Sequence, residues 1–424
     1  MKFNINEQNI GNLLLSFFIF GTLFPTLRIL IVGSQTSINI ASYLFSILPE
    51  FMAVIVLFYS YLVFHHNSII LKLHFFDWAI IGFSLSNVLI GTFLAKNLLL
   101  SMYGIRMSYF PIIFYFIFRF GNLDLMLNTL NNIFKWFFIV GIIGIILYFG
   151  FYNQMLVMIQ KTNPLIAEYF IVRMTSVFWS PVLFSTIMVT TFAYFYHRFL
   201  VKSEWYHYFI LGFVWLCVLL SVTRGGLIVL FIGFVFLSLL HKKWMLSFRV
   251  FVLFFFIFVI VGYYISSPLV FLIWIISSAS DAITLKKGVT RVDLWIKAFE
   301  SFKTQPFGLG LGKAGHVAAR FFSDNPEKAA IYSTDGWYLK LANETGIWGL
   351  LSYFFLSIYF FVIFLKKNIL VILDFKYSWI FAVFIMVNVQ NLVSNVLDFY
   401  LFSFFYWGLL GLSFNIIYNK ISKS

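Results

Sequence analysis

The sequence is poor in charged residues, acids and cysteine. Only 10% of its 424 residues are charged, with 15 acids against 29 lysines and arginines, whereas about a quarter of a soluble globular domain is charged. A single cysteine, Cys217, excludes a disulfide within the chain and any multi-cysteine metal site. Because 62% of the residues are hydrophobic, we expect a polytopic membrane protein and not a soluble globule.

The sequence also lacks the usual signatures of a bound metal or cofactor. The histidines show no HExxH spacing, and no Asp-x-Asp pair is present to hold Mg²⁺ on a sugar nucleotide. Residues 310–315 fit the GxGxxG pattern, but no predicted strand precedes them. A Walker loop is excluded because Phe307 stands at its first glycine and Ala314 follows Lys313. We therefore expect no metal and no cofactor.

The net charge of +14 does not indicate nucleic-acid binding. Lysine and arginine fall mostly in short loops between apolar segments, which is the orientation signal of a membrane protein. We therefore expect the lipid bilayer, and no nucleic acid, as a partner.

Apolar runs long enough to cross a bilayer core, about 20 residues each, recur about twelve times. The predicted spans are 11–32, 40–64, 76–95, 98–119, 134–152, 179–198, 206–222, 225–240, 248–266, 338–365, 377–395 and 398–416. The predicted fold is an all-α polytopic membrane protein with about twelve transmembrane helices and a large structured outer (periplasmic) loop that contains amphipathic helices.

The loop charges predict the orientation, since cytoplasmic loops carry the excess of lysine and arginine. One side collects most of the basic residues: Lys2, Lys72, Arg119, Lys135, Arg198, Lys202, Lys242, Lys243, Arg249, Lys366, Lys367, Lys376, Lys420 and Lys423. The short loops of the other side offer little beyond Lys96 and Arg224. We expect both termini in the cytoplasm and two long segments, 152–178 and 267–337, facing outward.

The outer loop, residues 267–337, is long enough to carry structure of its own. Its apolar residues 268–276 are too few to span and are expected to lie along the interface or to re-enter. Residues 289–302 show helical spacing of apolar side chains, which predicts an amphipathic helix. Pro306 and the glycines of 308–315 then predict a turn.

Three arginines are expected on the outer side. Arg224 follows a transmembrane helix and precedes two glycines, so its planar fork of donors is a candidate phosphate clamp. Arg291, in the amphipathic helix, is a candidate second clamp, and Arg173 precedes the sixth span. The alternatives are a snorkelling side chain for Arg224 and solvated charges for the other two.

Acids and aromatic residues near the end of the outer loop are further candidates. Asp335 precedes a long helix and is either an N-cap or a general base for an incoming sugar hydroxyl. Glu344 lies deeper in that helix and is a candidate for binding the pyrophosphate or the glycan. A buried acid there needs a partner, and we expect an arginine. Side chains that could stack on sugars, or belong to an interfacial aromatic belt, are Trp179, Trp295, Trp337 and Tyr338.

Two arginines, Arg28 and Arg106, fall inside predicted spans nearer the outer side. They line the same cavity, or they pair with Glu50 or with backbone carbonyls.

These residues form a pattern that resembles the O-antigen polymerase and ligase superfamily of bacterial envelope glycosyltransferases. The similarity covers roughly the C-terminal half, in the segments 222–226, 291–298, 306–310 and 339–346. The resemblance implies transfer of a glycan from polyprenyl pyrophosphate to an acceptor at the outer face of the cytoplasmic membrane, without nucleotide sugar or metal. It assigns the pyrophosphate to Arg224 and Arg291.

Ligases of that superfamily carry a histidine just before the helix that follows the large loop. The corresponding place here reads Thr334-Asp335-Gly336, which favours a polymerase of lipid-linked repeat units over a ligase. The expected organisation is residues 1–222 as seven transmembrane helices and 223–424 as the polymerase-like region. The expected substrate is a polyprenyl-pyrophosphate-linked oligosaccharide, and a chain-length regulator and a flippase are candidate partner proteins.

A transporter for the same lipid-linked oligosaccharide is the alternative from another class. Transporters commonly show paired repeats with broken helices near the midplane, and we expect neither in this chain.

Overall fold

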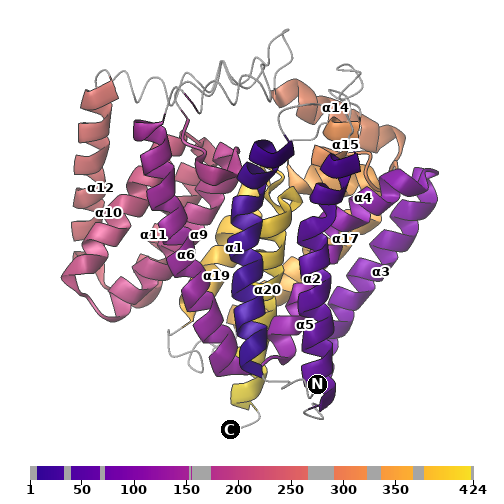
Figure 1. The fold of residues 1–424 in the computed structure, drawn as a ribbon, viewed down its shortest axis with the longest axis horizontal. Coiled ribbons are helices and arrows are strands. Elements are labelled where there is room, and N and C mark those ends of the chain that lie inside the picture. The colour runs from indigo at the N-terminus through magenta and orange to yellow at the C-terminus, as the bar shows by residue number, and fades with distance from the viewer. Residues whose placement is uncertain are drawn as a thin grey trace. The chain divides into compact units, whose positions relative to one another are not determined.

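The computed structural model describes residues 7–32, 40–66, 72–151, 154, 173–265, 291–321, 336–365 and 377–421. All regular structure in these ranges is helical (Figure 1). By contacts, the chain divides into two compact units. The first comprises residues 1–70, 117–268 and 411–415, and the second comprises 71–116, 269–410 and 416–424.

The first unit is built from α1 (Glu7–Val32), α2 (Ile40–His66), α6 (Leu123–Gly150), α9 (Pro181–Val201), α10 (Trp205–Ser221), α11 (Arg224–His241) and α12 (Trp244–Ile265). Helix α9 packs against α6, α10 and α11, and nearly all of its side chains are buried. Ser180 starts α9 by accepting a hydrogen bond from the backbone N–H of Leu183 at 3.3 Å, and Pro181 occupies the first turn, where no N–H partner is lost.

The second unit contains α3 (Phe75–Ala95), α4 (Leu98–Ser108), α14 (Arg291–Thr304), α15 (Gly315–Phe321), α17 (Trp337–Leu365), α19 (Ser378–Gln390) and the 3₁₀ turn η3 (Val396–Asp398). Helices α5 (Ile113–Phe120) and α20 (Tyr400–Ile421) contribute residues to both units. Helix α17 packs against α3 and α14.

The predicted all-α membrane fold is confirmed. Nine helices in the described ranges are long and apolar enough to cross a membrane. The other three predicted spans correspond to α9, which falls outside that group of nine, and to α10 and α19, which are 17 and 13 residues long.

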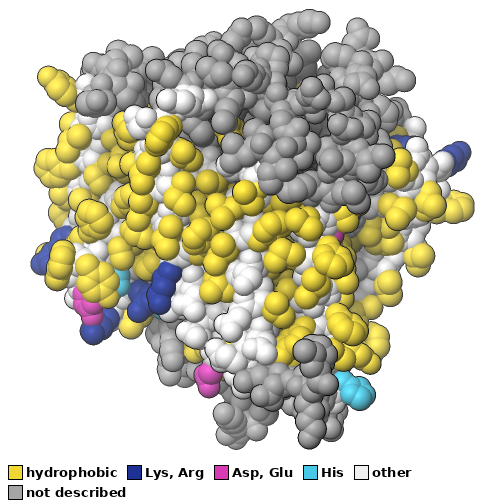
Figure 2. Space-filling model, in the orientation of Figure 1, with side chains coloured by type: hydrophobic (Ala, Val, Ile, Leu, Met, Phe, Trp, Pro, Cys, Tyr) yellow, Lys and Arg dark blue, Asp and Glu magenta, His cyan; other side chains and the backbone are white. Residues whose placement is uncertain are grey.

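Exposed apolar side chains mark lipid-facing helix surfaces. In α3, Leu85, Leu89 and Phe93 recur at the spacing of one helix face and are 58%, 69% and 84% exposed. Figure 2 shows hydrophobic side chains over most of the described surface of the face in view. Because an ordinary aqueous surface carries many more charges, this surface fits contact with lipid.

The expectation that no helix is broken is wrong, because α17 is kinked at Gly346 and the predicted span 98–119 is not a single regular helix. Residues 98–119 form α4, then a 3₁₀ turn η1 (Phe110–Ile112), then α5. Pro111 lies in this turn, and its missing N–H and fixed ring interrupt the α-helical ladder. The predicted span 377–395 also ends early, because α19 stops at Gln390.

Of the structure predicted within residues 267–337, part is confirmed and part lies outside the described residues. The predicted amphipathic helix 289–302 is α14, which buries Leu294 and Ala298 and exposes Ile296 and Phe299. The apolar stretch 268–276 lies outside the described residues.

Candidate functional site

Arg224 is the first residue of α11, immediately after a two-residue turn that joins it to α10. Val222 ends α10 in the left-handed region, with φ 49° and ψ 39°, a costly conformation for a β-branched residue. Thr223 is the N-cap, but its hydroxyl bonds to Ser221 at 2.9 Å and not to the helix. The first turn of α11 therefore carries an arginine, no acid and no side-chain cap.

Gly226 lets α9 approach the start of α11. A Cβ at this position would lie 2.7 Å from the Thr223 hydroxyl and would collide with the hydroxyl of Ser185 in α9. Ser185 is fully buried, and its hydroxyl has no hydrogen-bond partner among the described residues. The glycine is thus required by packing, and an unsatisfied donor lies beside the helix N-terminus.

Arg173 lies at the same end of the first unit. Its guanidinium Nη2 donates a hydrogen bond to the carbonyl oxygen of Val222 at 3.1 Å. The neighbouring residue Met174 donates its backbone N–H to Leu220 O at 2.9 Å, so the segment is fixed to the end of α10. The structure thereby brings together two of the three predicted arginines, Arg173 and Arg224.

The other end of this unit carries most of its described basic side chains. Arg198 and Lys202 lie where α9 ends, and Lys243 donates to the carbonyl of Leu200. Helix α10 separates this basic end from Arg224, and its 17 residues correspond to about 26 Å. Within this unit, the basic residues predicted for one side and Arg224, predicted for the other, thus lie at opposite ends.

The start of α11 has the physical character of an anion site. The first N–H groups of a helix have no partner in the helix, and the macrodipole places partial positive charge there. An arginine at the first position adds a cation where the dipole disfavours one, and a bound anion reverses that unfavourable interaction. A phosphate group is the natural occupant of such a site.

In the second unit, Arg291 is the first residue of α14, but its side chain lies outside the described part. The half-buried Trp295 lies one turn later. Asn343 of α17 donates its side-chain amide to Ala298 O at 3.1 Å, which fixes the middle of α14 against α17.

The glycine loop, residues 305–315, pairs with α17 through backbone hydrogen bonds. Leu309 N–H donates to Asn343 O at 2.7 Å and Gly310 N–H donates to Glu344 O at 2.9 Å, while Ile347 N–H donates to Pro306 O at 2.9 Å. These carbonyl and N–H groups of α17 can pair with the loop because the helix kinks at Gly346, which has φ 68° and ψ −157°. Two of the segments that carried the resemblance, 306–310 and 339–346, therefore contact each other.

Several glycines of this loop are required by conformation and space. Gly308, Gly310 and Gly312 have φ of 98°, 106° and 79°, where a Cβ is unfavourable. A Cβ at Gly308 would lie 2.6 Å from Glu344 O, and one at Gly312 would collide with the backbone of Leu100 in α4. The predicted turn is confirmed, and the GxGxxG match reflects close packing.

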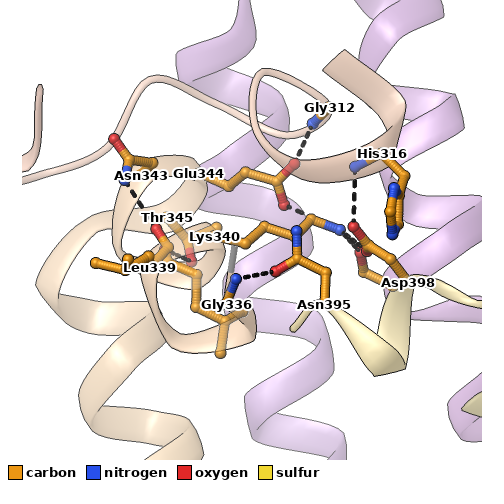
Figure 3. Close-up of polar contacts among 12 residues, drawn as sticks. Gly312, His316, Gly336, Leu339, Lys340, Asn343, Glu344, Thr345, Asn395 and Asp398 are labelled. Carbon is orange, nitrogen blue, oxygen red and sulfur yellow. Dashed lines mark hydrogen bonds and ion pairs between the residues drawn. The ribbon is translucent and has the colours of Figure 1, made fainter. Parts of the chain in front are cut away.

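Beneath the loop lies a fully buried group of polar side chains, the Lys340 cluster. It consists of Lys340, Glu344 and Asp398, which Figure 3 shows, together with Ser108. The Lys340 ammonium forms an ion pair with Asp398, lies 3.8 Å from Glu344 Oε2 and donates to Ser108 Oγ at 2.7 Å. Charges at this depth are expensive unless they are paired.

The two carboxylates of the cluster also accept hydrogen bonds from the glycine loop and from α15. Gly312 N–H donates to Glu344 Oε1 at 2.9 Å, and His316 N–H donates to Asp398 Oδ2 at 3.1 Å (Figure 3). The expected arginine partner of Glu344 is therefore wrong, since the structure pairs this acid with Lys340, one turn earlier in the same helix.

The predicted aromatic residues of α17 lie in packed surroundings. Trp337 is 1% exposed, and the Lys340 ammonium lies 4.9 Å from its ring centroid. Tyr338 stacks on Phe354 at 5.1 Å and donates its hydroxyl to Asn388 Oδ1 at 3.0 Å. Their proposed stacking on sugar faces stays a prediction.

Some candidates fall outside what the structure describes. Asp335 precedes the described residues of α17, and the side chain of Arg28 is also outside them. Arg106 lies over the Tyr103 ring at 5.6 Å. Within the described ranges, no three His, Cys, Asp or Glu residues are grouped as a metal site would need.

The sequence reasoning missed Lys340, Asp398 and Ser108 as members of a site. One signal was present, because Lys340 and Glu344 stand four residues apart inside an apolar span, where two charges are costly unless paired. Asp398 lies 58 positions away along the chain, and no local pattern links it to Lys340.

A family model described as "O-Antigen ligase" matches residues 209–354. A comparison with curated proteins finds no match. The matched residues include Arg224, Arg291, the glycine loop and two members of the Lys340 cluster, Lys340 and Glu344, and they cover the segments 222–226 to 339–346 that carried the resemblance. Residues 209–354 are therefore similar to this family, in agreement with the resemblance to the O-antigen polymerase and ligase superfamily.

Proposed function

We propose that the protein is a membrane glycosyltransferase that polymerises oligosaccharide repeat units carried on polyprenyl pyrophosphate, at the outer face of the bacterial cytoplasmic membrane. The observation that carries this proposal is the start of α11. Arg224 is the first residue of a helix without a side-chain N-cap, and Arg173 donates a hydrogen bond to the carbonyl oxygen of Val222, two positions before Arg224. This pair lies at the end of its unit opposite the basic residues. Such an arrangement suits a pyrophosphate group.

The chemistry follows from where charge develops. The acceptor hydroxyl oxygen bonds to the anomeric carbon of the donor sugar while the bond from that carbon to the pyrophosphate oxygen breaks. Negative charge then grows on the leaving pyrophosphate, and fixed guanidinium groups in a water-poor site stabilise it. We assign this role to Arg224 and Arg291, with Arg173 assisting.

The acceptor sugar must lose the proton of its attacking hydroxyl. We assign Asp335 as the group that orients this hydroxyl and accepts its proton, because it directly precedes Gly336 and α17 in the matched segment. Trp295 is the candidate for contact with a sugar face. No step in this scheme requires a nucleotide sugar.

The second candidate function is ligation of a finished glycan to lipid A core or another acceptor, which the description of the family model favours. The sequence Thr334-Asp335-Gly336 favours polymerisation, since it lacks the histidine expected of a ligase at that place. Both reactions use the same donor and differ in the acceptor.

A deletion strain distinguishes the two reactions. Loss of a polymerase leaves single repeat units on the final carrier, whereas loss of a ligase leaves long glycans on polyprenyl pyrophosphate. We expect the deletion strain to carry single repeat units on the final carrier. Long glycans on polyprenyl pyrophosphate would contradict a polymerase and favour a ligase.

A further inference from the structure

The Lys340 cluster connects three separate parts of the second unit. Lys340 and Glu344 belong to α17, Asp398 ends η3, and Ser108 ends α4. All four residues are buried, at 0–1% exposure. The cluster accepts hydrogen bonds from one backbone N–H of the glycine loop and one of α15, so its charges act on the polypeptide and not on solvent.

Each carboxylate holds a different backbone amide. Glu344 accepts from Gly312 in the glycine loop, and Asp398 accepts from His316 in the first turn of α15. Lys340 lies between the two carboxylates and is paired with both. Removal of the lysine would leave two buried carboxylates without a cation, which is strongly destabilising.

The glycine loop approaches the Lys340 cluster closely because it has a glycine at the contact. Gly315 has φ 70°, and a Cβ there would lie 3.0 Å from Lys340 Cδ and would collide with an Asp398 oxygen. The loop also continues directly from α14, whose Ala298 is held by Asn343. The position of the loop therefore determines where α14, which begins at Arg291, can lie on α17.

We infer that Lys340, with Glu344 and Asp398, is a positioning device that holds the glycine loop, the start of α15 and, through them, α14 in place on α17. The consequence for catalysis rests on the proposed function, which gives Arg291 its role at the pyrophosphate. On this account Glu344 acts through the loop and not by contact with the substrate.

Amide hydrogen exchange on the full-length protein in nanodiscs tests the inference, read with peptides that separate Gly312 from His316. Lys340 and the His316 N–H donate to different oxygens of Asp398. In Asp398→Asn one of these oxygens becomes an NH₂ donor, and because the remaining oxygen favours the lysine ammonium, the His316 contact is lost. We expect exchange at His316 to rise on the order of tenfold with little change at Gly312. Glu344→Met removes the acceptor of Gly312, so exchange should rise there and not at His316.

Both of these variants keep one carboxylate beside Lys340 and therefore avoid an unpaired buried cation. Lys340→Met should raise exchange at both amides if it folds. The matched control is Lys297→Met, which removes an exposed lysine of α14 and should change neither amide. Equal rises at both amides in Asp398→Asn and Glu344→Met, or no rise in either, would overturn the inference, because a general loss of stability does not select one amide.

The same preparations separate this inference from the proposed function. If the wild-type chain elongates lipid-linked glycan, Asp398→Asn should elongate roughly tenfold more slowly than Lys297→Met. Site-specific exchange with no loss of elongation would contradict the link to α14. A wild-type chain that does not elongate contradicts the proposed function, while the exchange pattern still decides the positioning role.

Discussion

Arg173 donates a hydrogen bond to the carbonyl oxygen of Val222 at 3.1 Å. Because Val222 lies two positions before Arg224, this bond brings the two arginines to the same turn. Val222 adopts a left-handed conformation that is unfavourable for its side chain. Strained residues persist where the surrounding structure holds them, and they concentrate at functional sites. Two further residues of the first unit, Ser176 and Trp179, which follow Arg173 closely in the sequence, have φ of 51° and 56°.

Arg224→Lys should lower glycan elongation by roughly 10²-fold or more. Lysine keeps the positive charge but loses the planar fork that binds a phosphate through two parallel hydrogen bonds, and loss of one such donor costs about 10²–10³ in rate. Polymer length and yield in a complemented deletion strain measure the effect. The matched control is Arg249→Lys, at an exposed position of α12, and normal polymer from Arg224→Lys would refute the assigned role.

Gly226→Ala should lower the unfolding temperature, because the new methyl group would collide with the Ser185 hydroxyl. Overpacking of this kind costs about 1–3 kcal/mol. Ser185→Ala in the same chain removes the colliding atom and an unsatisfied buried hydroxyl, so the double variant should recover part of the loss. Thermal unfolding of the purified chains measures both, and additive losses in the double variant would show that the two residues are not in contact.

Gly312→Ala and Gly346→Ala should each destabilise the second unit by more than about 1 kcal/mol, since both positions have positive φ and a Cβ would meet backbone atoms. Gly82→Ala in α3 is the matched control. No atom lies within 4 Å of a Cβ at that position, and alanine is the better helix former by about 0.5–1 kcal/mol. Unfolding temperatures should therefore fall for the first two variants and stay equal or rise for the third, and the reverse order would contradict the described loop.

Lys313 should make stability depend on pH in the alkaline range. Two effects lower the pKa of Lys313 below its ordinary value of 10.5. The larger is partial burial, and the smaller is repulsion by the positive charge of the nearby Lys96. Between the lowered pKa and 10.5 the unfolded chain binds more protons than the folded chain, so stability rises with pH in that window. Lys313→Met should remove this component, as measured by unfolding temperature against pH, and identical profiles for both chains would contradict it.

The helices were predictable from sequence because each is a long apolar run that a bilayer requires. Helices lie at all twelve predicted spans, but two of them are interrupted: 98–119 at Pro111, a residue visible in the sequence, and 338–365 at Gly346. The amphipathic helix α14 was predictable for the same reason, since Leu294 and Ala298 lie on one helical face.

The internal polar contacts were not predictable in the same way. The sequence placed Glu344 in an apolar span and required a partner for it, but it did not identify Lys340. An ion pair between Lys340 and Asp398 joins residues from different elements, and helical periodicity carries no information about such a pairing. The glycine loop was predicted as a turn, but its backbone pairing with α17 depends on the kink at Gly346. From the sequence pattern alone, Gly346 is only a residue of low helix propensity within a predicted helix.

The most direct test of the central claim is reconstitution of the purified chain in liposomes with a synthetic oligosaccharide repeat unit on polyprenyl pyrophosphate. We predict glycans of two or more repeats together with release of free polyprenyl pyrophosphate, one for each new linkage, and no such products with Arg224→Lys. Movement of the lipid-linked unit between leaflets without elongation, or equal elongation by Arg224→Lys, would contradict the account.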